Sequence, residues 1–350
     1  MCTDFLLRAS DGSVVNGRSM EFGSNLHSEL LICGRGTPKH SRAPDREHGL
    51  RWTTTFGYIG MNVFGGPIVA DGMNEAGLAV GCLWLPNITR YKQTVSDPAK
   101  ALIADSFVSW ALGNFATVAQ VADALNAVEV WGDKKMETSL PLHFSIHDKA
   151  GDSIVIELLD GSPSVHRNPV AVLTNAPAFT WHLANIGTFV GLAAQDVNPI
   201  TIGSEDFCPP GHGSGMRGLP GDSTPPSRFI RTVFQKNFAV PPDNNSAACN
   251  LAIHLLNTVD IPKGTSAALP TQNEQSKDDH TQWIVVKALT QQTFSFRTYD
   301  NPTMMQVDLA KLDFSTPGEN THPLPSTPVA IDITEKVSDL VPAQRPPSRL

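Results

Sequence analysis

The sequence predicts an α+β protein in which sheets and helices pack in layers. Strand-like apolar runs fill the first 85 positions, helical patterns follow, and strands and helices then return without a regular strand–helix alternation. Hydrophobic residues make up 41% of the 350 positions and charged residues 17%, which favours a folded chain over a disordered one. A chain of this length is able to bury a large core.

The N-terminal strands are predicted from short apolar runs bounded by turn formers. Residues 3–9 and 14–18 flank the polar cluster 10–13 and read as a hairpin. Further strands are expected at 30–33 and 58–63, with a Gly-, Pro-, Arg- and His-rich loop over 34–50. Residues 68–80 read as strand, turn and strand, with Asp71-Gly72 and Asn74 as the turn formers.

Helices are predicted next from residue spacing. Ile103, Phe107, Trp110 and Asn114 fall on one helical face, and Gly113-Asn114 ends that helix. Thr117 with Gln120 fits a capping box for a second helix from 118 to about 128.

The second half of the chain mixes strands, helices and loops. Paired strands are expected over 140–159 around a turn at 148–152, a short strand at 171–174, and a hairpin at 283–299. Residues 203–227 are expected to form a loop, 228–238 a helix, and 247–257 a helix capped by Ser246. We expect one domain over 2–315 and an irregular Pro-rich tail over 316–350.

Composition and the chain's opening residues exclude several function classes. The formal net charge is -8 and no basic patch dominates, so no nucleic-acid partner is expected. No run of about 18 apolar residues exists, so no membrane association is expected. The opening residues lack a secretory signal, and five scattered cysteines make a poor disulfide framework or zinc site. We therefore expect reduced thiols and a cytoplasmic location.

Cys2 is the strongest candidate for chemistry in the sequence. Once Met1 is removed, this residue carries a thiol and a free α-amine whose proton affinities are close. The amine is then able to accept the thiol proton without a separate histidine base. A cysteine at position 2, taken alone, is ordinarily just a small residue.

Other nucleophile or metal arrangements are weaker. The sequence has no Gly-x-Ser-x-Gly elbow and no glycine-rich phosphate loop. His143 and His147 point the same way in a strand pattern, but no carboxylate or cysteine motif accompanies them, which favours structural histidines over a metal pair. Cys82 lies in an apolar run and is expected in the core.

Several motifs in a fixed order give the chain a family resemblance. It resembles the choloylglycine hydrolase family, which includes bile salt hydrolases and penicillin V acylases, over about residues 2–310. The resemblance implies an αββα four-layer sandwich of the N-terminal nucleophile hydrolase type. The matching segments are Met1–Thr3, Gly17–Phe22, Asp71–Leu78, Pro141–Phe144, Leu173–Phe179, Gly218–Asp222, Ser227–Phe229 and Phe296–Asn301.

The resemblance also implies roles for individual residues. Cys2 is the expected nucleophile with its α-amine as base, and Arg18 matches an arginine that favours the thiolate. Asn175 matches the asparagine of the oxyanion hole, which the backbone N–H of Trp84 completes. Arg228 matches an arginine of the surrounding polar network.

Two positions depart from the family pattern. Glu21 stands where the family has Asp, the acid that orients the α-amine, and is one methylene longer. Trp84 stands where bile salt hydrolases have Asn and many penicillin V acylases have Tyr. Its large apolar ring favours an aryl or fatty acyl group over a steroid, in a pocket to which Met20, Phe22 and Phe64 also contribute.

The resulting prediction is a cysteine hydrolase of linear amides that resembles penicillin V acylase and acts on a small-molecule N-acyl amide through a thioester. The alternatives are a conjugated bile salt hydrolase and, from another class, a catalytically silent binding protein on the same fold. We expect no metal and no organic cofactor. The resemblance further implies a homo-oligomer, as family members are often tetramers.

Overall fold

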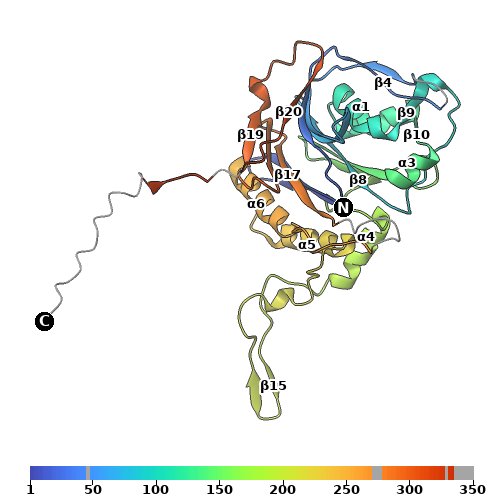
Figure 1. Ribbon diagram of the computed structural model, residues 1–350. Coiled ribbons are helices and arrows are strands. Elements are labelled where there is room, and N and C mark those ends of the chain that lie inside the picture. The colour runs from blue at the N-terminus through green and yellow to red at the C-terminus, as the bar shows by residue number, and fades with distance from the viewer. Residues whose placement is uncertain (45–47, 270–277, 328–329, 335–350) are drawn as a thin grey trace.

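Two antiparallel sheets lie face to face in the computed structural model, and helices cover their outer faces (Figure 1). The structure describes residues 1–44, 48–269, 278–327 and 330–334. The architecture is an αββα sandwich, which confirms the fold implied by the family resemblance. The first sheet contains, in spatial order, β14 (Val172–Leu173), β1 (Cys2–Arg8), β2 (Val14–Phe22), β17 (His280–Ala288), β18 (Thr293–Thr298) and β19 (Met305–Asp308).

The second sheet is larger and includes the paired strands predicted over 140–159. In spatial order it contains β13 (Pro163–Arg167), β12 (Ser153–Leu158), β11 (Leu142–Asp148), β8 (Leu78–Trp84), β7 (Ile68–Asn74), β6 (Tyr58–Val63), β3 (Glu29–Cys33) and β20 (Glu319–Pro323). The predicted hairpins 3–18, 140–159 and 283–299 are confirmed as β1–β2, β11–β12 and β17–β18.

Helices close the sandwich on both sides. In Figure 1, α5 (Pro225–Phe238) and α6 (Asn245–Asn257) run across the first sheet, where they contact β1, β2 and β17. On the second sheet, α1 (Phe107–Asn114) contacts β7 and β8, and α2 (Val118–Ala124) contacts β11. Two shorter helices, α3 (Lys134–Ser139) and α4 (Phe179–Asn185), complete the set of α-helices in the described residues.

The space between the sheets holds buried charged groups as well as apolar ones. Asp4 and Arg18 on the first sheet are at most 1% exposed, as are Asp71 on the second and Lys287 on the first. Because burying an unpaired charge is costly, each of these groups needs a partner. Lys287 Nζ lies 2.5 and 2.6 Å from the two Asp71 oxygens and so joins the sheets through a buried ion pair.

The turn predicted at Asp71-Gly72 is wrong, because β7 continues to Asn74. Asp71 is held inside the sandwich by Lys287, and Gly72 faces the neighbouring strand closely. A Cβ built on Gly72 would lie 2.6 Å from Ile59 O, so only glycine fits. Asn74 does end the strand, since its Oδ1 accepts hydrogen bonds from backbone N–H groups of the turn that follows.

Several helix boundaries also differ from the predictions. Ile103 belongs to β9 (Ala101–Ile103), which pairs with β10 (Glu129–Trp131), so α1 begins only at Phe107. The residue that caps α6 is Asn244 rather than Ser246, since its Oδ1 accepts a 3.1 Å hydrogen bond from Ala247 N. α5 begins earlier than expected, at Pro225, a residue type suited to the first helical turn. The predicted cap of α2 is confirmed, with Thr117 Oγ1 accepting from Gln120 N.

Short strands occur in or beside three segments that were expected to be irregular. β4 (Pro38–His40) lies inside the expected loop 34–50 and pairs with β5 (Arg51–Thr53), which follows directly after that loop. β20 pairs with β3, so residues 319–323 of the expected tail join the second sheet; residues 328–329 and 335–350 of that tail lie outside the described residues. β15 (Ile200–Ile202) and β16 (Glu205–Phe207) form a hairpin that projects away from the sandwich in Figure 1.

In the described parts of the chain, no helix has the length and apolar character needed to cross a membrane.

Candidate active site

Cys2 begins β1 and is placed by strand pairing rather than by a loop. It lies opposite Met20 of β2 and is 2% exposed. Its Sγ lies 3.4 Å from Arg18 Nη2 and 3.7 Å from Met20 Sδ. Its backbone N–H donates a 2.7 Å hydrogen bond to Asn175 Oδ1. Met1 precedes it, and the Met1 terminal nitrogen donates to the backbone oxygen of Glu21.

Arg18 reaches the Cys2 sulfur from β2 and is itself anchored. Its Nη2 also donates a 2.6 Å hydrogen bond to Cys82 O, and its Nε lies 3.8 Å from Asp71 Oδ1. Burial opposes the guanidinium charge, but the Cys2 thiol and the Asp71 carboxyl hold the pKa of Arg18 above its ordinary value. The Trp283 ring lies 6.0 Å from its Cζ. Arg18 therefore presents a fixed positive charge to the sulfur.

Asn175 follows β14 and bridges the two sheets. Its Oδ1 accepts from Cys2 N and, at 2.8 Å, from Arg228 Nη2. Its Nδ2 donates a 2.7 Å hydrogen bond to the backbone oxygen of Trp84, at the end of β8. Two donors on Oδ1 fix the orientation of the amide, so its N–H groups face the Trp84 end of the site.

Arg228 projects from α5 toward the start of β1. Besides Asn175, its guanidinium donates to the backbone oxygen of Cys2 and, at 2.7 Å, to Thr3 Oγ1. It is 0% exposed. The structure therefore brings Cys2, Arg18, Asn175 and Arg228 together, although they come from distant parts of the sequence.

Glu21 is completely buried, but it does not hold the nitrogen of Cys2 in this structure. Its Oε1 accepts a 3.1 Å hydrogen bond from Thr281, and its Oε2 has no partner among the described residues. Burial raises the pKa of this carboxyl, although the charge of Arg228 opposes the shift. The Cys2 nitrogen is held by Asn175 instead.

A small apolar cavity of about 40 Å³ adjoins Cys2. All four residues predicted to shape a pocket line it: Met20, Phe22, Phe64 and Trp84. The Phe22 ring meets Phe64 and Trp84 edge to face, with ring centroids 6.3 and 6.1 Å away. Cys82, expected in the core, is buried and lines the same cavity.

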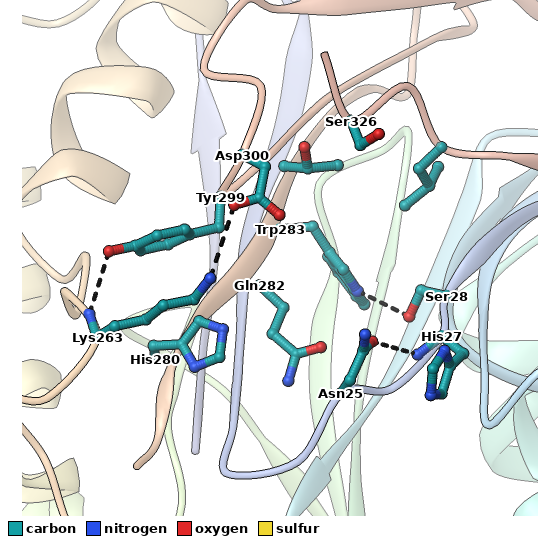
Figure 2. Close-up of a pocket in the computed structure, with 12 residues that line it drawn as sticks. Asn25, His27, Ser28, Lys263, His280, Gln282, Trp283, Tyr299, Asp300 and Ser326 are labelled. Atoms are coloured by element: carbon teal, nitrogen blue, oxygen red, sulfur yellow. Dashed lines mark hydrogen bonds and ion pairs between the residues drawn. The ribbon is translucent and has the colours of Figure 1, made fainter. Parts of the chain in front are cut away.

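One wall of this cavity is held by Gln282 of β17. Its Nε2 donates to Phe22 O at 3.0 Å and to Ser24 O at 2.6 Å, and its Oε1 accepts from Leu26 N at 3.0 Å. Phe22 and Leu26 both line the apolar cavity. Figure 2 shows Gln282 among the residues of a separate polar pocket, about 340 Å³ in volume.

Sequence reasoning missed the residues that hold Asn175 in place. His182 of α4 is buried, and its Nε2 lies 2.8 Å from Asn175 O, so this ring nitrogen carries the proton. Its ring stacks on Phe229 of α5, with centroids 4.7 Å apart. Burial lowers the pKa of His182 to about 4. A spacing of seven residues does not predict this hydrogen bond from sequence, because His182 reaches Asn175 O only once α4 has formed.

His143 and His147 have structural partners in the sandwich. His143 Nε2 lies 3.1 Å from Thr174 O, next to Asn175, and His147 Nε2 lies 2.6 Å from Asp4 Oδ1. Among the residues that the structure describes, no group of three or more His, Cys, Asp or Glu side chains could hold a metal ion.

Taken together, the site offers a buried thiol beside a fixed cation, the Asn175 side-chain amide held between Arg228 and Trp84, and an apolar cavity next to the sulfur. A cation near a thiol favours the thiolate, which is the nucleophilic form. Amide donors stabilise an oxyanion when carbonyl carbon is attacked. This arrangement is suited to acyl transfer from an apolar acyl compound.

Comparison with known proteins gives a consistent result. The model of the linear amide C–N hydrolases, choloylglycine hydrolase family, matches residues 2–324. A bile salt hydrolase/transferase of Clostridium perfringens is 31% identical, over 89% of this chain and 93% of that protein. A penicillin V acylase of Pectobacterium atrosepticum is 25% identical, over 87% of this chain and 79% of that protein.

Solved structures agree with the sequence relatives. A conjugated bile acid hydrolase variant from Clostridium perfringens superposes with a TM-score of 0.84 at 28% identity, covering 95% of this chain and all of the other. The penicillin V acylase from Agrobacterium tumefaciens gives a TM-score of 0.73 at 25% identity, covering 93% and 92% of the two chains.

Proposed function

The chain belongs to the choloylglycine hydrolase family of linear amide C–N hydrolases, and from that premise we propose that Cys2 is its nucleophile. The proposal rests on the position of the Cys2 sulfur, which lies 3.4 Å from the buried Arg18 guanidinium and next to an apolar cavity. Asn175, Arg228 and Glu21 support the reaction around it. The amide substrate donates its acyl group to the sulfur.

The first step needs removal of Met1, which frees the α-amine of Cys2. The amine accepts the thiol proton, and the sulfur forms a bond to the substrate carbonyl carbon. The protonated α-amine then gives that proton to the leaving nitrogen as the C–N bond breaks, leaving a thioester. Water adds to the thioester carbonyl, the C–S bond breaks, and the acid departs while the thiol is restored.

The oxyanion of each tetrahedral intermediate is assigned to Asn175 and to the backbone N–H of Trp84. Oδ1 of Asn175 is occupied by two donors, so its Nδ2 is the group available to the substrate. One Nδ2 hydrogen serves Trp84 O, which leaves the second for the oxyanion. Removing a donor of this kind typically costs about 2.7–4 kcal/mol of transition-state stabilisation.

Glu21 is assigned the positioning of the freed α-amine. Within the described parts of the chain its buried Oε2 accepts no hydrogen bond, and Thr281 holds the other oxygen. An ammonium group at the Cys2 nitrogen would supply the missing donor. Its charge would also offset the burial that raises the pKa of Glu21.

The acyl group is proposed to be an aryl or fatty group, in an enzyme similar to penicillin V acylases. The cavity beside Cys2 encloses about 40 Å³, far below the ~300–1,000 Å³ of pockets that enclose drug-sized ligands. Admitting any acyl group requires Phe64, which is 48% exposed, or its aromatic neighbours to move. A flat ring or a chain requires less movement than a steroid.

A conjugated bile salt hydrolase is the second candidate, because the bile salt hydrolase of Clostridium perfringens has the higher identity, 31% against 25% for the acylase of Pectobacterium. Release of the amine from penicillin V, from a long-chain N-acyl homoserine lactone, from glycocholate and from taurocholate separates the two. Turnover of the first two alone supports the acylase assignment. Preferential turnover of the cholates overturns the acylase assignment. If none of the four compounds is hydrolysed and the Cys2 thiol does not react with an alkylating reagent, the chain is a binding protein.

We further propose a cytoplasmic homo-oligomer, a tetramer by family resemblance. The β15–β16 hairpin exposes Ile200, Ile202 and Phe207 to 59%, 62% and 54%, which is unusual unless a second copy covers them. Replacing all three by Ser should reduce the mass measured by light scattering, and an unchanged mass would contradict this contact.

The proposed cytoplasmic location is supported by the cysteines. All five are free thiols, which suits a reducing compartment.

A further inference from the structure

A second cavity, about 560 Å³ in volume, lies at the end of β1 opposite to Cys2. At ~3.3 Å per residue, the six steps from Cys2 to Arg8 separate it from the sulfur by about 20 Å. Leu6, Ile154 and small residues of α2 provide an apolar lining, and Arg8, Arg167 and Lys236 provide charge. This cavity is therefore separate from the acyl cavity.

The charged groups of this cavity differ from those of the polar pocket in Figure 2. There, Lys263 lies 3.6 Å from the Asp300 carboxylate, and Trp283 Nε1 donates to Ser28 Oγ at 3.1 Å. By contrast, the side chains of Arg8 and Arg167 are exposed and form no hydrogen bond or ion pair with any part of the chain that the structure describes. A pocket with paired polar groups needs no ligand, whereas unpaired cations favour one.

The charge balance around the second cavity is positive in an acidic protein. Three cationic side chains line it against one acid, Asp152, which pairs with neither arginine. The whole chain carries a formal net charge of -8. Three cations and one carboxylate therefore line this cavity, and the fields of the three cations add there.

Two of these cations are held in position. A Cβ built on Gly151 would lie 2.3 Å from Arg8 Nε, so the Arg8 guanidinium packs directly on the backbone of Gly151. Gly151 has a φ of +85°, which disfavours any larger residue there. Lys236 Nζ donates to Val170 O, and burial lowers the pKa of Lys236 to about 8. At neutral pH Lys236 is therefore still mostly cationic, and a bound anion would raise its pKa again.

We propose that this cavity binds a small amphipathic organic anion, a carboxylate with a short apolar chain. The two arginines and Lys236 hold the head group by charge-assisted hydrogen bonds, and the chain lies on Leu6 and Ile154. The volume falls within the ~300–1,000 Å³ range of ligand pockets. The site is independent of Cys2 chemistry and remains whether or not the proposed amidase function holds.

Protection from an arginine-specific reagent tests this site in the full-length protein. Arg8 and Arg167 are exposed in the unliganded structure, as is Arg217, which lies outside the cavity and serves as the internal control. The protein is treated with phenylglyoxal with and without octanoate, and modification of each arginine is followed by peptide mass spectrometry. Octanoate should slow modification of Arg8 and Arg167 at least fivefold and leave Arg217 unchanged.

Two further ligands and two variants distinguish binding at this site from nonspecific protection. 1-Octanol, which lacks the charge, and inorganic phosphate, which lacks the chain, should each protect less than octanoate. Arg167→Gln should weaken the protection of Arg8 by octanoate, and Arg217→Gln should not. The site is refuted if octanoate protects neither arginine, if it slows all three equally, or if 1-octanol or phosphate alone protects as well as octanoate.

Discussion

Arg228 Nη2 donates a 2.8 Å hydrogen bond to the side-chain Oδ1 of Asn175. The same oxygen accepts from the Cys2 backbone nitrogen, so α5, β1 and the loop after β14 meet at one amide group. Because both donors bind the oxygen, the amide cannot flip without leaving two buried donors unpaired. Arg228 therefore sets which way the Asn175 N–H groups face, without itself needing to touch the reacting atoms.

Replacing Arg228 by Lys should lower kcat/KM for the turned-over amide by about 100-fold. Lysine keeps the charge, but a single ammonium group cannot bind Asn175, Thr3 and Cys2 O with the planar geometry of a guanidinium. Steady-state kinetics measure the effect. Arg231→Lys is the matched control, since Arg231 lies one turn along α5 and bonds to Thr258 O and Pro220 O. Equal losses in both variants would contradict the assignment.

Glu21→Asp should retain or increase activity. The substitution keeps the carboxylate that is proposed to orient the α-amine, and the shorter side chain matches the family pattern. A complete loss would show that the site has been rebuilt around Glu.

The pH profile provides an independent test of Glu21. Burial raises the pKa of this carboxyl above 4.5, so the carboxylate is lost at a higher pH than for an exposed Glu. The acid limb of kcat/KM should therefore lie above pH 4.5, and the residual activity of Glu21→Gln should lack that limb. An unchanged acid limb in Glu21→Gln would exclude this role.

His182 should make stability depend on pH below neutrality. Burial lowers its pKa from 6.5 to about 4, so between these values the unfolded chain binds a proton that the folded chain does not. The free energy of unfolding should therefore fall as the pH decreases from about 6.5 to 4, by up to ~3 kcal/mol from this group. Urea titrations at several pH values should show that the free energy of unfolding of His182→Phe depends less on pH than that of wild type. The exposed control His254→Gln should show the pH dependence of wild type.

Gln282→Ala should alter acyl selectivity more than the chemical step. Gln282 donates hydrogen bonds to the backbone oxygens of Phe22 and Ser24 and accepts one from Leu26 N. Phe22 and Leu26 line the acyl cavity. We expect KM for an aryl acyl amide to rise about tenfold, with a smaller change in kcat. A tenfold change corresponds to ~1.4 kcal/mol, which is within the net contribution of one or two hydrogen bonds. Gln306→Ala on β19 is the control, because Gln306 is exposed and, among the described residues, its side chain hydrogen-bonds only with Ser295. A fall in kcat alone would contradict a positioning role.

The hairpins could be predicted from local sequence patterns, whereas the site residues could be predicted only from the order of several motifs along the chain. The hairpins β1–β2 and β11–β12 follow from apolar runs around polar turns, which are local signals. Ordered motifs brought Cys2, Arg18, Asn175 and Arg228 forward together. Asp71 was misread as a turn residue because its partner, Lys287, lies 216 positions away on another sheet. Only the fold reveals such a pair.

The supporting residues of the site were invisible for the same reason. His182 and Gln282 act through backbone groups of other elements, and no spacing rule links either one to Asn175 or to Phe22. Unpaired Arg8 and Arg167 likewise carry no local signal, because a pattern of residues cannot show that a charge lacks a partner. Hydrogen bonds to the backbone depend on tertiary placement rather than on local sequence preference.

Mass spectrometry of the N-terminal tryptic peptide after acid quenching tests the central claim most directly. Enzyme turning over its amide substrate should yield the peptide Cys2–Arg8, without Met1, carrying the substrate's acyl mass as a hydroxylamine-sensitive thioester. The Cys2→Ser variant should remain folded, carry no such thioester and retain less than about a tenth of wild-type turnover. Full activity with Met1 retained, or with Cys2 never acylated, would contradict the proposed mechanism.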